Sequence, residues 1–174
     1  ATGSTPYTLA LAFRRGVPEL QVSTTLQGLA LALPPPLGKP ADSSLPLRFE
    51  TQVARESLTG LAANGNGNNA PPLRDQITLD LGALGSATYL RDLSGPQARV
   101  LRGAIGIGLG NGEFAPLPAQ GVAANIQQGK LDMDAWEGVL AQATGAETPT
   151  APAMAQDYLP TTLALRARTL TLQR

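Results

Sequence analysis

Large apolar residues recur at every second position along most of this 174-residue chain. Successive side chains of a β-strand point to opposite faces of the sheet, so this period places the large apolar residues of a segment on one face. Residues 7–14 show the pattern clearly, with Tyr7, Leu9, Leu11 and Phe13 separated by smaller residues. Similar segments, bounded by Pro, Gly and Asn clusters, predict further strands at 19–25, 29–33, 45–50, 77–81, 87–90, 100–109, 121–128 and 162–173. The chain is therefore expected to be mainly β, with an antiparallel sheet.

One segment departs from the period of two. Residues 131–141 carry apolar side chains at helical spacing, and Asp132 is a residue type favoured at a helix N-cap. Trp136 stands four positions after this cap, where it can pack against the apolar residue that precedes the cap. We therefore expect one short helix near 132–142 with Trp136 buried against the sheet. A flexible linker rich in Pro, Ala and Thr is expected at 144–156.

The chain contains no cysteine and no histidine. Disulfides, Cys-ligated metals and catalysis by Ser–His–Asp or Cys–His groups are therefore impossible within it, and the commonest general base is missing. Thirteen basic residues balance thirteen acidic ones, whereas a nucleic-acid-binding protein normally has a basic excess. These observations predict a non-catalytic protein that needs no cofactor and does not bind nucleic acid.

Two clusters have the residue types of a ligand site. Asp132, Asp134 and Glu137 offer carboxylates, but calcium usually takes six or more oxygen ligands, and acidic residues at a helix start also complement its dipole. The glycines of 103–112 suggest a phosphate loop, which requires a helix directly after the glycines. Ile105 and other apolar residues alternate with these glycines instead, so the segment is predicted to be a strand that another group approaches closely. No metal site is predicted.

Three stretches of the chain carry a resemblance to a known family. The first is LQGLALALPPPLGKPAD at 26–42 with LPLRF at 45–49, the second is LDMDAW at 131–136, and the third is the strand pattern of 159–172. In sequence, order and spacing they resemble the YhdP family of AsmA-like bacterial envelope proteins. The resemblance covers about residues 20–174.

This resemblance implies that residues 1–174 are one β-rich segment of a longer periplasmic protein, tethered to the inner membrane by a region outside this chain. It implies a curved, taco-like sheet with an apolar inside. The family is associated with moving phospholipid between the inner and outer membranes and with maintaining the outer-membrane permeability barrier. The implied partners are phospholipid acyl chains and the remainder of the same long chain, and the family has no catalytic residues.

The alternating apolar residues would then face lipid. The candidate lipid-facing residues are Leu9, Leu11, Phe13, Leu29, Leu31, Leu33, Leu47, Phe49, Leu79, Leu81, Ile105 and Ile107. A sheet covered on both sides would show similar alternation as ordinary core. The alternative function is therefore a β-sandwich binding or adhesion module with a dry core. The two hypotheses differ in whether the apolar face is an open concavity or a filled interior.

Overall fold

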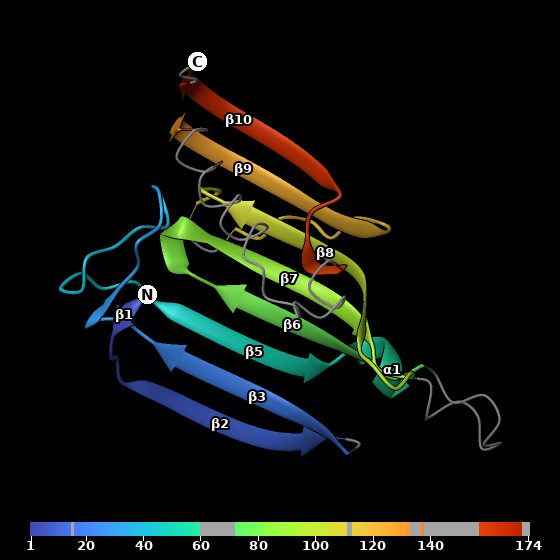
Figure 1. Ribbon diagram of the computed structural model, residues 1–174. Coiled ribbons are helices and arrows are strands. Elements are labelled where there is room, and N and C mark those ends of the chain that lie inside the picture. Colours follow the sequence, from blue (N-terminus) through green and yellow to red (C-terminus); the bar gives the residue numbers. More distant parts are fainter. Residues whose placement is uncertain (15, 60–71, 111–112, 133–136, 138–156, 172–174) are drawn as a thin grey trace, which may run out of the picture.

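The computed structural model describes residues 1–14, 16–59, 72–110, 113–132, 137 and 157–171. These residues are mainly β, as the sequence predicts. The long strands are β2 (Tyr7–Arg14), β3 (Val17–Thr24), β5 (Leu47–Val53), β6 (Arg74–Asp80), β7 (Gly85–Asp92), β8 (Arg99–Ile107), β9 (Gly121–Asp132) and β10 (Thr162–Thr171). They form one open eight-stranded sheet in the order β10-β9-β8-β7-β6-β5-β3-β2 (Figure 1). The short strands β1 (Thr2–Gly3) and β4 (Leu29–Ala30) form a separate antiparallel pair.

Neighbouring strands from β2 to β8 are antiparallel, as expected from the alternating pattern. The first of these pairs is closed by a tight turn in which Gly16 has a φ of 75°, a conformation that glycine adopts without steric cost. Pairing of β2 with β3 is in register from Tyr7 opposite Thr24 to Arg14 opposite Val17. This half of the sheet is a meander that is interrupted by the loop between β3 and β5.

The last two strands join the sheet differently from the expected antiparallel pairing. β9 runs parallel to β8, and β10 runs parallel to β9. A parallel neighbour must start from the same end of the sheet, so its connection has to cross back over the full strand length. Residues 108–120 and 133–161 provide these long connections. The sheet is thus mixed, with its parallel part at the β10 edge.

The helix expected near 132–142 falls almost entirely outside the described residues, as do Trp136 and the linker expected at 144–156. Of that segment, Asp132 ends β9 and Glu137 is helical. A short helix that the sequence did not suggest, α1 (Arg55–Thr59), follows β5. Ser57 is fully buried there, and its hydroxyl donates to the Pro72 carbonyl and accepts from the Arg74 amide, both at 2.8 Å.

The strand expected at 29–33 ends after two residues. Leu31 forms only an isolated bridge with Lys39, whose ammonium lies among the backbone carbonyls of the same loop. Lys39 Nζ donates to the carbonyls of Leu26, Leu29 and Pro40 at 2.8, 2.6 and 2.9 Å. The Lys39 residue is 8% exposed. The loop between β3 and β5 is therefore organised around a buried cation rather than a continued strand.

The glycine-rich segment lies in β8 and confirms the expected close approach. A Cβ added to Gly103 would lie 2.4 Å from a ring carbon of Tyr89 on β7. A Cβ added to Gly106 would lie 2.4 Å from a methyl carbon of Leu109. Small residues dominate the buried positions nearby, such as Ala104 and Ala124. The glycines thus let large neighbouring side chains lie directly on the backbone of β8.

Candidate functional site

The register of the sheet aligns one apolar residue from every long strand into a single row. Successive Cα partners across the sheet are Leu9, Val22, Phe49, Leu79, Ala87, Ile105, Ala124 and Leu163. Directly paired residues in a sheet point to the same side. We call this side of the sheet the apolar face, which also includes the residues two positions before or after each member of the row.

The residues one position away from this row in each strand form a second row, which points to the opposite side of the sheet and has different side chains. Its partners are Ala10, Gln21, Glu50, Thr78, Thr88, Ala104, Ala123 and Thr162. These side chains are small, polar or charged. Large apolar residues therefore gather on one side of the sheet, and the alternation seen in single strands adds up across all eight.

Eight of the twelve candidate lipid-facing residues lie on the apolar face. They are Leu9, Leu11, Phe13, Leu47, Phe49, Leu79, Ile105 and Ile107. The structure does not bring Leu29, Leu31 and Leu33 to this face, because the Lys39 loop ends their strand early and removes them from the eight-stranded sheet. Leu81 follows the end of β6 and precedes the 3-10 helix η1 (Gly82–Leu84).

Other residues on the apolar face were absent from the candidate set. They include Leu20, Val22, Ile77, Tyr89, Val122, Ile126, Leu163 and Leu165. Leu20, Val22, Leu163 and Leu165 show the same alternation as the candidate strands, so the signal for them was present in the sequence. Val122 gives little signal alone because small residues follow it, and only pairing with β8 assigns it to this face.

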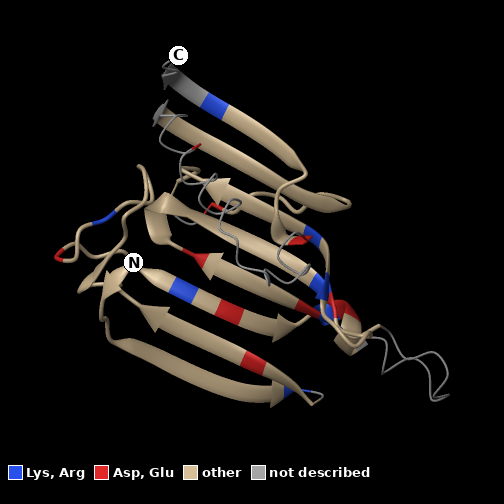
Figure 2. Ribbon diagram, in the orientation of Figure 1, with Lys and Arg blue, Asp and Glu red and all other residues tan. Residues whose placement is uncertain are grey.

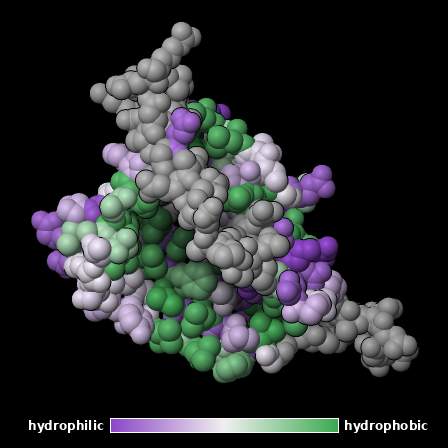
Figure 3. Space-filling view, viewed as in Figure 1, coloured by the Kyte–Doolittle hydropathy of each residue, from purple (hydrophilic) through white to green (hydrophobic). Residues whose placement is uncertain are grey.

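The apolar face is open at the β2 edge. Tyr7, Leu9, Leu11 and Phe13 are 68%, 53%, 55% and 70% exposed. Figure 3 shows apolar side chains gathered on this side of the molecule around a recessed centre. At the β10 edge Leu163 is also exposed. The described part of the face thus has exposed apolar residues at both edges of the sheet.

Charged residues gather at one end of the strands, near α1 (Figure 2). Arg91 Nε and Nη2 donate to the two Asp75 carboxylate oxygens at 2.9 and 2.5 Å, and the Asp75 side chain is 5% exposed. Arg91 Nη1 also donates to the Tyr158 hydroxyl at 3.2 Å. The hydrogen bond to Asp75 is the main reason that the pKa of Arg91 is raised, although burial opposes it. This cluster forms a polar border of the apolar face.

Tyr158 belongs to the connection before β10 and lies against the apolar face. Its ring contacts the Tyr89 ring edge-on, with 5.1 Å between centroids. The Tyr89 hydroxyl donates to the Tyr158 backbone carbonyl at 3.1 Å. Burial and the nearby Tyr158 hydroxyl raise the pKa of Tyr89. The two tyrosines and Arg91 therefore hold the end of this connection to the sheet, a set of contacts between residues far apart in the sequence.

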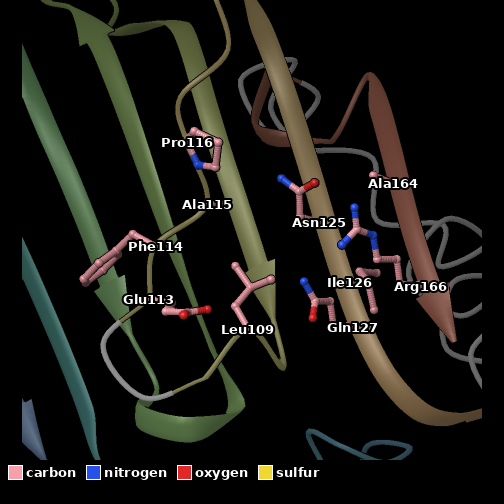
Figure 4. A pocket seen from close by; sticks show the side chains of 10 residues that line it. All are labelled: Leu109, Glu113, Phe114, Ala115, Pro116, Asn125, Ile126, Gln127, Ala164 and Arg166. Carbon is pink, nitrogen blue, oxygen red and sulfur yellow. The ribbon is translucent and has the colours of Figure 1, made fainter. Parts of the chain in front are cut away.

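A groove of about 550 Å³ lies over β9 and β10 on the opposite side of the sheet (Figure 4). One wall comes from the connection before β9, including Leu109, Glu113 and Pro116, and the other includes Arg166 of β10. Glu113, Gln127 and Arg166 are exposed, so the polar groups of the groove are solvated. Its chemistry is mixed, whereas the apolar face offers a continuous apolar surface. The apolar face is therefore the candidate functional site.

Within the described ranges, no three His, Cys, Asp or Glu residues come together in a way that could hold a metal ion. Among the same residues, no helix has the length and apolar character needed to cross a membrane. Comparison of the chain with protein-family models, with curated proteins and with solved structures finds no match in any of the three.

Proposed function

We propose that this chain is a non-catalytic segment of a YhdP-like, AsmA-like envelope protein, in which the apolar face lines a trough for phospholipid acyl chains. The full-length protein would be periplasmic and tethered to the inner membrane outside this chain. There it would carry phospholipid between the inner and outer membranes and so maintain the permeability barrier. The observation that carries the proposal is the row of eight apolar residues that crosses every strand of the sheet.

The energetics of such a surface suit an acyl chain. Burial of each lipid CH₂ group against apolar side chains contributes about 0.8 kcal/mol without any directional contact. A tail could therefore move along the row while exchanging one apolar neighbour for the next. Soluble proteins rarely leave large contiguous apolar patches exposed, so the exposed Leu9, Leu11 and Phe13 also require a partner that covers them.

The arrangement of the sheet supports a trough over the alternative, a β-sandwich with a dry core. A sandwich packs the inner faces of two sheets about 10 Å apart. In the part of the chain that the structure describes, the eight-stranded sheet is accompanied only by the β1–β4 pair, whose strands have two residues each. A pair of this size is too small to cover the apolar face.

Site-specific photo-crosslinking in the full-length protein tests the proposal. Leu11 and Ala12 are neighbours on β2 and both are exposed, but they point to opposite sides of the sheet. A photoreactive amino acid at Leu11 should capture phospholipid in cells, while the same group at Ala12 should capture little. Both positions are exposed, so a difference in lipid capture between them reports which side of the sheet contacts lipid.

The same comparison at Leu79 and Thr78, in the middle of the sheet, extends the test beyond the edge. Both residues are half-buried and lie on β6. Equal capture at the two members of each pair, or no lipid capture at Leu11 and Leu79 in a protein present at normal levels, would refute the trough. The dry-core module would then be the better explanation.

A further inference from the structure

The groove over β9 and β10 is recessed because small residues flank Asn125 on its floor (Figure 4). The Cα partner of Asn125 on β10 is Ala164, and its Cα partner on β8 is Gly106. Asn125 itself is half-buried, and the next pair on the floor, Gln127 and Arg166, has long polar side chains. The volume of about 550 Å³ lies within the range of about 300–1,000 Å³ that is usual for small-ligand sites. The recess is therefore large enough to hold a small molecule.

The wall of the groove, formed by Leu109 and residues 113–116, is fixed to the sheet at Gly106. A Cβ added to Gly106 would lie 2.4 Å from a methyl carbon of Leu109 and 3.5 Å from the Cβ of Ala115. Ala115 is buried, so the wall is packed against β8 at this point. The groove lies over the surface of the sheet rather than at its edge, so a neighbouring strand beside β10 would leave it in place.

Polar side chains with opposite charges face each other across the groove. Glu113 points from the wall toward β9, and Arg166 extends from β10 toward β9 (Figure 4). The amides of Asn125 and Gln127 lie between them. In the described part of the chain, Glu113 and Arg166 form no ion pair, and the side chains of these four residues make no hydrogen bond. Their charges and hydrogen-bonding groups are therefore available to a ligand.

We propose that this groove binds a short peptide of two or three residues with free termini. The Glu113 carboxylate would bind the ammonium group of the peptide, and the Arg166 guanidinium would donate two parallel hydrogen bonds to its carboxylate. The amides of Asn125 and Gln127 each offer a donor and an acceptor, which match those of a peptide bond. An apolar side chain of the peptide would lie against Leu109. The groove and the apolar face are on opposite sides of the sheet, so this inference stands independently of the proposed lipid function.

The dimensions and charges of the groove favour a peptide over simpler ligands. Its wall is packed on β8 and Arg166 is on β10, two strand intervals or about 10 Å away. An extended peptide of three residues covers about 10 Å, and one of two residues about 7 Å. A simple anion would be attracted by Arg166 but repelled by Glu113. A neutral sugar would leave both charges without a counter-ion. A short peptide instead supplies both opposite charges at a matching separation.

Isothermal titration calorimetry of this chain with the tripeptide alanyl-leucyl-alanine measures the binding. We expect a Kd of about 0.1–1 mM, since ion pairs in an open site contribute little each. An N-acetylated peptide and a C-amidated peptide should each bind about fivefold more weakly. Glu113→Gln should bind the free and N-acetylated peptides equally, and Arg166→Met should bind the free and C-amidated peptides equally. Glu50→Gln and Arg48→Met, on the same side of the sheet but outside the groove, should retain both preferences.

Ala164→Phe gives a second readout that does not depend on charge. Position 164 is exposed and lines the groove, so the fold accommodates a larger side chain that fills the recess. This variant should keep the circular dichroism spectrum of the parent chain but lose peptide binding. Ala12→Phe, at an exposed position of β2 on the groove side of the sheet, should bind normally.

Three results with the peptides would overturn the proposal: no binding at millimolar concentration, equal binding of the free, acetylated and amidated forms, or binding unaffected by Ala164→Phe. Glycerophosphoethanolamine carries the same two charges without a peptide bond. If it binds as tightly as the tripeptide, the groove recognises the charges alone and the assignment to a peptide is wrong.

Discussion

Substitution of Arg91 by Met should destabilise the fold far more than the same substitution at Arg48. Met retains most of the apolar stem of Arg but removes the guanidinium. At position 91 this leaves the Asp75 carboxylate, whose side chain is 5% exposed, without its two hydrogen bonds from Arg91. At position 48 the partner is Glu50, at 3.5 Å, and the Arg48 side chain is 57% exposed.

The magnitudes follow from burial. Removal of one partner of a buried ion pair typically costs about 3–5 kcal/mol because a charge remains buried and uncompensated. An exposed pair contributes about 0–1 kcal/mol. For a chain of this size, the loss at position 91 corresponds to a decrease in Tm of roughly 6–20 °C. Loss of the contact from Arg91 to the Tyr158 hydroxyl adds to the effect.

Urea unfolding followed by circular dichroism measures both free energies of unfolding. We expect the two Arg→Met variants to differ by at least about 2 kcal/mol. The double variant Asp75→Leu with Arg91→Met removes the stranded charge and should recover much of the loss. Equal effects of Arg91→Met and Arg48→Met, or a double variant less stable than Arg91→Met, would show that the buried ion pair does not act as we reason.

Two further predictions concern the buried Lys39 ammonium and the Tyr89 hydroxyl. Lys39→Met leaves three loop carbonyls without their shared donor. It should lower the free energy of unfolding, measured by the same urea assay, by about 3 kcal/mol. A loss below about 1 kcal/mol would contradict the role of the buried ammonium. The pKa of the Tyr89 hydroxyl is raised in the folded chain, so as pH rises the hydroxyl loses its proton first in the unfolded chain. The free energy of unfolding should therefore fall as pH rises past 10.0, the ordinary pKa of tyrosine. Tyr89→Phe should make this alkaline decline shallower, which unfolding curves at several pH values would detect; an unchanged decline would contradict the assignment.

The strands were predictable because their signal is local. The segment 7–14 alternates strictly and forms β2 with the same bounds, and 162–173 corresponds to β10 at Thr162–Thr171. Eight of the twelve candidate residues share one face for the same reason, since a period of two fixes the side of the sheet within each strand. Their contact with lipid remains a prediction.

The remaining features depend on contacts between distant residues. Leu31 alternates as well as Leu9, yet the Lys39 ammonium binds the surrounding carbonyls and ends that strand. Asp75 and Arg91 come together only because β6 pairs with β7 in one particular register. The parallel placement of β9 is not visible in its alternation, because a strand has the same period in either direction. The alternation of apolar residues therefore predicts the strands and the side of the sheet to which each residue points. Which strands become neighbours depends on pairing between distant segments of the chain.

The row that crosses the sheet from Leu9 to Leu163 also has a length. Eight strands have seven intervals of about 4.8 Å, so the row extends for about 34 Å across the strands. The hydrocarbon core of a bilayer is about 30 Å thick, so the tails of one leaflet occupy about 15 Å. A tail lying along the row would span about three strand intervals, and the row could hold two tails end to end. No single strand would then determine where a lipid rests, and one tail could advance by a strand interval while most of its contacts remain.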